Sequence, residues 1–309
     1  MLHLAESSLY SSTVAGKRSR SRGFIPVDFL ILVYVSFTTI LLLIVNRPIS
    51  ERVWLIAGNL AIAVVVITLR NIDPLSQNRL LRIARRLYPV VLFTFFYEQT
   101  SSLIHVFFPG WFDAALSQFE IEIFGAQPSL AIEHLYNPML NDIVMACYVF
   151  YYLCLPLGLV FLVLRKKEGA VDRLITASAL TFFVSYTLFF LYPVEGPRYH
   201  LAELFTQPFD GYLFVPLVKR IMDTAAVHGG AMPSSHAAVA LIVLWYVIRE
   251  SRRWGMALAP VILGLTIGCV WGRFHYVSDV AVGALITVVA VWLTEHAYRN
   301  RWLGSRNLD

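Results

Sequence analysis

Long apolar stretches separated by short polar connections run through most of the chain. Crossing the apolar core of a bilayer, about 30 Å thick, takes roughly 20 mostly apolar residues per helix. Stretches of about that length with few charges inside them recur eight times: 27–46, 53–69, 88–108, 141–164, 174–192, 235–249, 256–274 and 278–297. The pattern predicts an all-α fold, a polytopic membrane helix bundle with about eight transmembrane helices.

The composition agrees with a membrane protein. Hydrophobic residues make up 58% of the chain and charged residues only 15%, far from the balance of an ordinary soluble domain. The three cysteines, Cys147, Cys154 and Cys269, fall inside apolar stretches at spacings that suit neither disulfides nor a zinc site. We interpret them as small core residues.

Lysine and arginine gather in every second connection. They cluster at 17–22, 70–86, 165–173, 249–253 and 299–306, while residues 87–164 contain neither. Cytoplasmic loops carry such an excess of basic residues, so both termini are predicted to be cytoplasmic and the alternate loops extracytoplasmic. We expect the plasma (inner) membrane. This distribution explains the net charge of +5, and no nucleic-acid partner is predicted.

The long connection after the third stretch has a helical pattern. "WFDAALSQFEIEIFGAQPSLAIEHLYNP" (111–138) spaces apolar residues at three and four, which favours one or two amphipathic helices at the outer membrane interface over a plain loop. The predicted organisation is a flexible basic tail (1–23), an N-terminal transmembrane pair (24–87), a six-helix catalytic core (88–298) and a cytoplasmic tail (299–309).

The predicted topology places three polar stretches on the outer side. They are "YPVEGPRYH" (192–200), "MPSSH" (232–236) and "GRFHYVSD" (272–279). Arg198 and Arg273 stand on this face against the charge bias, which indicates an anionic partner. His275 and Asp279 are four residues apart, so the carboxylate can hold one imidazole N–H and leave the other nitrogen as a nucleophile.

The second stretch leads directly into a helix. Ser234 or Ser235 is the predicted N-cap, and the free N–H groups of that helix end, beside His236, suit a phosphate. With one histidine to attack and the other to protonate the leaving oxygen, these residues predict a site that moves a phosphoryl group. Two histidines and a carboxylate could instead hold zinc. Because the arginines would repel a metal and suit a phosphate, we predict neither a metal nor an organic cofactor.

These motifs carry a family resemblance. "PSSH", then "HYVSD" with Gly283 downstream, resembles the type 2 phosphatidic acid phosphatase superfamily over residues 88–297. "GPRY" and the upstream "D…FG..P" loop look more like its inositol phosphorylceramide synthase branch. The resemblance implies that His275 becomes a phosphohistidine, that Asp279 orients it and that His236 is the general acid. It also implies that Arg198 and Ser234 bind phosphate.

The chain departs from the phosphatase pattern at two basic positions. Leu191 replaces a lysine and Cys269 an arginine, so phosphate binding rests on fewer cations. Ser235 and Arg273 complete the candidate phosphate-binding set.

The sequence therefore predicts an integral-membrane enzyme that passes a phosphoryl or phospho-alcohol group from a lipid to an alcohol or lipid acceptor. One alternative is a lipid phosphate or prenyl pyrophosphate phosphatase with water as the acceptor. Another is a non-enzymatic transporter or lipid-binding protein. Transporters place ionisable residues at mid-membrane, whereas here they cluster at one end.

Overall fold

The computed structural model describes residues 23–49, 51–72 and 78–300. Within these ranges the chain folds into thirteen α-helices and two short 3₁₀ segments, without a β-strand. The predicted tails at 1–23 and 299–309 lie almost wholly outside the described residues, so their character stays a prediction.

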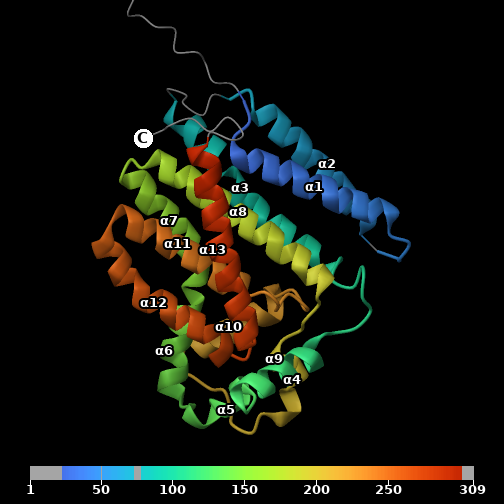
Figure 1. Ribbon diagram of the computed structural model, residues 1–309, viewed down its shortest axis with the longest axis vertical. Coiled ribbons are helices and arrows are strands. Elements are labelled where there is room, and N and C mark those ends of the chain that lie inside the picture. Colours follow the sequence, from blue (N-terminus) through green and yellow to red (C-terminus); the bar gives the residue numbers. More distant parts are fainter. Residues whose placement is uncertain (1–22, 50, 73–77, 301–309) are drawn as a thin grey trace, which may run out of the picture.

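The helices follow one another with short connections (Figure 1). Nine of them form eight long units: α1 (Pro26–Ile44), α2 (Arg52–Leu69), α3 (Arg79–Ser101), α6 (Pro138–Val149) with α7 (Tyr151–Leu164), α8 (Glu168–Leu191), α11 (Ser235–Glu250), α12 (Arg252–Trp271) and α13 (Val277–Arg299). The rest lie in connections: α4 (Asp113–Phe124), α5 (Pro128–Ala131), η1 (Glu133–Leu135), α9 (Pro197–His200), η2 (Ala202–Leu204) and α10 (Phe214–Ala225).

The bundle has the lengths and apolar character of a polytopic membrane protein. Five of the described helices, α1, α2, α8, α12 and α13, are long and apolar enough to cross a membrane, and α6 with α7, bent by 45°, would make a sixth. The predicted helical membrane bundle is thus confirmed. The other two predicted spans correspond to α11, which has only 16 residues, and to α3, whose first turns carry arginines.

Helix α3 begins earlier than the apolar pattern indicates. The predicted span is 88–108, whereas α3 covers Arg79–Ser101. The Arg85 side chain is fully buried, where it pairs with the Asp28 carboxylate of α1, and the Tyr88 hydroxyl donates to the same carboxylate at 2.5 Å. Because the charges of Arg85 and Asp28 neutralise each other between α3 and α1, the polar residues at the start of α3 belong to the helix bundle and not to a loop.

Helix α8 lies in the middle, packed against α1, α3, α7, α11 and α13. The ring of Phe183 on α8 stacks on that of Tyr34 on α1, with centroids 4.4 Å apart. Asn59 of α2 donates to the Thr38 hydroxyl of α1 at 3.1 Å and accepts from the Gln99 amide of α3 at 3.0 Å. Buried polar contacts of this kind fix how the N-terminal pair packs on the remaining helices.

The two ends of the bundle differ in charge. The predicted basic connections after α7 and α11 meet at one end, where Lys167 Nζ is 3.0 Å from Glu250 and an Arg249 Nη is 2.6 Å from Glu295. The three polar motifs lie at the opposite end, the lower one in Figure 1. This separation matches the alternation of charge along the sequence.

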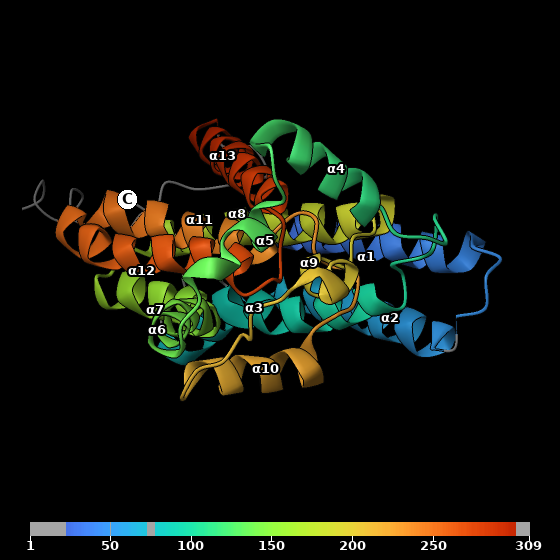
Figure 2. The ribbon, with the colours of Figure 1, turned by 90° about the horizontal axis from the view of Figure 1, so that it is seen from below.

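The connections at the motif end are themselves helical. The helices predicted between 111 and 138 are present as α4 and α5, and α4 lies on the other side of the bundle from α10 (Figure 2). Helix α10 was not predicted. The Asp142 carboxylate of α6 accepts the backbone N–H groups of Leu213 and Val215 at 2.8 and 3.0 Å, which fixes the start of α10 by a contact that no local pattern encodes.

Candidate active site

A cavity of about 410 Å³ opens among the helices at the motif end. Polar groups contribute to its lining, among them His236, His275, Arg198 and Glu195. Its other walls are mainly apolar and aromatic residues: Val90, Phe93, Tyr97, Tyr148, Tyr151, Tyr152, Leu155, Phe182, Tyr186, Met222 and Val239. A lining that combines polar groups with many apolar and aromatic side chains fits a molecule with a polar head and a hydrocarbon part.

His275 stands in the turn between α12 and α13, held from two sides. Its backbone N–H donates to the Cys269 carbonyl at 3.0 Å. Its Nδ1 lies 2.8 Å from the carbonyl oxygen of Ala231, and because a carbonyl can only accept, Nδ1 carries the hydrogen. In the neutral ring Nε2 then keeps its lone pair, which is the state that a nucleophile requires.

Asp279 is fully buried in the first turn of α13. Its Oδ2 accepts the Tyr276 N–H at 2.7 Å, which caps the helix, and lies 3.5 Å from His275 Nδ1. The predicted proximity of this carboxylate and this imidazole is therefore present. Nδ1 donates its short hydrogen bond instead to the backbone carbonyl of Ala231, a partner that the sequence does not indicate.

His236 lies in the first turn of α11, and its ring is close to that of His275. The two ring centroids are 5.7 Å apart, close enough for both rings to contact one phosphate group. The His236 ring also packs against Tyr148 and Tyr151, at centroid distances of 5.6 and 4.1 Å. These tyrosines therefore pack around a histidine and help to position it. The general preference of aromatic residues for membrane interfaces does not predict this role.

The two serines differ in placement. Ser234 is the N-cap of α11: its hydroxyl accepts the Ala237 N–H at 3.4 Å, and the side chain is fully buried. Ser235 lines the cavity, whereas Ser234 does not. A Cβ on Gly283 would come within 2.6 Å of the Ser234 carbonyl, so this glycine permits α13 to approach the entry of α11. Because Ser235, the first residue of α11, lines the cavity, the positive end of the α11 dipole lies there as well.

Arg198 reaches the cavity from the short helix α9. Its backbone N–H donates to the Arg273 carbonyl at 2.7 Å, which joins the first motif to the third. Gly196 precedes it with φ +94°, and a Cβ there would lie 2.6 Å from the Phe274 carbonyl. The guanidinium lies over the Tyr199 ring, 4.5 Å from its centroid.

Asp113 of α4 holds the first and third motifs together. Its carboxylate accepts the N–H groups of Glu195 and Gly196, each at 2.9 Å, and the Tyr276 hydroxyl at 3.2 Å. Glu120, two turns later, accepts the N–H of Ser278 at 2.7 Å. The sequence pattern predicts an amphipathic helix here but not this role, which depends on contacts between residues distant in sequence.

Arg273 points away from the cavity. Its guanidinium lies 3.9 Å from the Phe205 ring centroid, donates to the Gln207 carbonyl at 2.7 Å and is 3.7 Å from Glu133. Burial raises the pKa of Glu133, but hydrogen bonds from Thr206 and Gln207, together with Arg273, outweigh it and hold that pKa below its usual value. Phosphate contact by Arg273 therefore stays a prediction that requires it to leave these partners.

The predicted residues are thus partly assembled. His236, His275, Arg198 and Ser235 line one cavity, with Asp279 behind His275, while Ser234 and Arg273 do not line it. Within the described ranges, no group of three or more His, Cys, Asp or Glu side chains is arranged to hold a metal ion.

Fold and site together define a helical membrane protein with a two-histidine, one-arginine cavity at one end, a set of groups suited to phosphate esters. A family model described as the PAP2 superfamily matches residues 116–293. The match covers more than half of the chain, which therefore belongs to the PAP2 superfamily. It extends from α4 into α13 and includes all three motifs. Comparison with curated proteins and with solved structures gave no match.

Proposed function

We propose that this protein is a lipid phosphotransferase that works through a phosphohistidine on His275. Membership of the PAP2 superfamily supports a lipid phosphatase or phosphotransferase. The observation that carries the proposal is the pair of histidines on one cavity, with centroids 5.7 Å apart and with Nδ1 of His275 engaged by a carbonyl. That engagement leaves Nε2 to attack phosphorus.

The proposed reaction has two steps, transfer of the phosphoryl group to His275 and then to the acceptor. His275 Nε2 forms a bond to phosphorus while the ester P–O bond breaks, and protonated His236 gives its proton to the departing alcohol oxygen. In the second step His236 takes the proton of an acceptor hydroxyl as that oxygen attacks phosphorus, and the N–P bond breaks. Arg198, Ser235 and the N-terminus of α11 stabilise the phosphate oxygens.

An alcohol acceptor is favoured by the shape of the cavity. Apolar and aromatic side chains, among them Tyr151, Tyr186 and Phe93, make up most of the remaining lining, which offers room for the hydrocarbon of a donor or an acceptor lipid. We propose transfer of a phosphoryl or phospho-alcohol head group between lipids, as in the inositol phosphorylceramide synthase-like branch, on the extracytoplasmic face of the plasma membrane.

Product analysis separates transfer from hydrolysis. Purified protein given a phosphate-labelled phospholipid is expected to convert it to a new lipid-soluble product only when an alcohol-bearing lipid is added, because water alone is a poor match to apolar walls. Thin-layer chromatography of the label measures both outcomes. Equal release of water-soluble phosphate with and without acceptor would instead identify a hydrolase.

Activity should not depend on a divalent metal. Because histidine, arginine and a helix N-terminus carry the proposed chemistry, turnover in EDTA is expected to stay within about twofold of the untreated rate. Vanadate, which adopts the five-coordinate geometry of phosphorus in the transition state, should inhibit. Loss of turnover in EDTA with recovery in added zinc would contradict the proposed roles of both histidines.

A further inference from the structure

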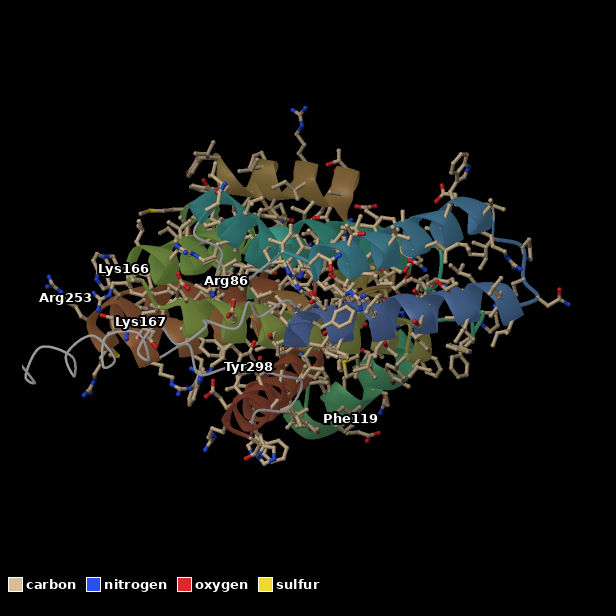
Figure 3. All side chains as sticks on the ribbon, turned by 90° about the horizontal axis from the view of Figure 1, so that it is seen from above. Arg86, Phe119, Lys166, Lys167, Arg253 and Tyr298 are labelled. Carbon is tan, nitrogen blue, oxygen red and sulfur yellow. The ribbon has the colours of Figure 1, made fainter. Side chains whose placement is uncertain are left out.

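A second cavity lies at the opposite, basic end of the bundle. It measures about 390 Å³ and is formed by the start of α3, the end of α7 and the start of α8. Its charged lining residues are Arg82, Arg86, Lys166 and Glu168. Figure 3 looks onto this end and labels Arg86 and Lys166. None of these residues takes part in the site described above.

Arg86 is the most deeply buried of the charged residues that line this cavity. Its side chain is only 6% exposed, with Nη1 2.8 Å from Glu168 and Nε 3.1 Å from Asp172. Its Nη2 is buried and donates no hydrogen bond. A buried guanidinium N–H without an acceptor is costly, and guanidinium groups are well suited to bind phosphate oxygens.

Cations outnumber carboxylates among the described side chains that line this cavity. Glu168 is shared, because Arg82 also lies 3.4 Å from it. Lys166 adds a third cation, and among the described residues it has no ion-pair partner. Its backbone has φ 58°, a left-handed conformation that is uncommon outside glycine. Three cations therefore face one lining carboxylate, with Asp172 behind it.

The remaining walls are apolar: Ile83, Leu87, Val163, Leu164 and Val171. A soluble anion would need only the charged part, whereas a phospholipid would use both parts, its phosphate on the cations and its chains along the aliphatic side chains. Basic pockets between transmembrane helices bind anionic head groups in this way. We propose that this cavity binds the phosphate-bearing head group of an anionic phospholipid from the leaflet at the basic end.

The test measures binding by native mass spectrometry in detergent. The full chain carries His275→Ala, so that the ligand is not consumed, and is titrated with short-chain phosphatidylglycerol. Lys166→Gln with Arg82→Gln removes two cations at this cavity. Arg253→Gln removes one exposed cation at the same end that does not line it. Phosphatidylcholine and glycerol 3-phosphate are the comparison ligands.

Each cation lost is expected to weaken phosphatidylglycerol binding about fivefold, so the double variant should bind about 25-fold more weakly while Arg253→Gln is unchanged. Phosphatidylcholine should bind the parent and the double variant equally. Equal phosphatidylglycerol binding by the parent and the double variant would overturn the proposal. So would glycerol 3-phosphate binding as tightly as the lipid, because the apolar walls would then contribute nothing.

Discussion

Replacement of His275 by alanine is expected to abolish turnover, with a loss of at least about 10⁴-fold in kcat, because the covalent step then has no nucleophile. The same variant should trap no phosphoenzyme from any donor. Rapid acid-free quenching with a labelled donor, followed by gel electrophoresis, measures the phosphoenzyme, and product formation measures turnover.

The matched control is His134→Ala. His134 is an exposed histidine at the same end of the bundle, and its Nδ1 contacts the Ala131 carbonyl at 2.6 Å. It does not line the cavity, so its replacement should leave both readouts unchanged. An acid-labile phosphoenzyme that still forms in His275→Ala would show that another residue accepts the phosphoryl group.

Replacement of His236 by alanine should instead give a loss that depends on the leaving group. General acid catalysis contributes about 10²–10⁴-fold where the departing oxygen is a strong base. An alkyl phosphate is therefore expected to suffer a loss of that size. A p-nitrophenyl phosphate ester, whose alcohol departs easily as an anion, should lose less than about tenfold.

Both donors are assayed side by side on the parent and on His236→Ala, and the ratio of the two losses is the deciding quantity. Tyr151→Phe is a useful companion, since it keeps the ring that packs 4.1 Å from the histidine and removes only a hydroxyl. Equal loss on the two donors would assign His236 to positioning and not to proton transfer.

Local pattern was sufficient for the helices and for the approximate place of the site. The apolar stretches became long helices, and the motifs around Arg198, His236 and His275 came to one cavity. Both predictions depend on properties that neighbouring residues share: apolar runs of membrane length, helix-capping serines, and a histidine four residues from an aspartate.

Contacts between distant segments could not be predicted in the same way. Arg85 pairs with Asp28 inside the bundle, so α3 begins before the apolar stretch predicted at 88. Asp113 accepts hydrogen bonds from a loop more than 80 residues away in sequence. Arg273 lies close to His275 in sequence, yet its left-handed backbone, φ 64°, accompanies a side chain that contacts Glu133 and Phe205. Such placements depend on three-dimensional packing, for which a single sequence carries no local signal.

The hydrogen bond that fixes the tautomer of His275 has a consequence for genetics. Its acceptor is the backbone carbonyl of Ala231, an atom that every amino acid supplies. A scan that replaces side chains one at a time cannot delete it, so position 231 will register only the fit of a larger side chain. This protection against point mutation does not extend to insertions or deletions between Gly229 and Ser234, because these would shift the carbonyl out of register with the imidazole.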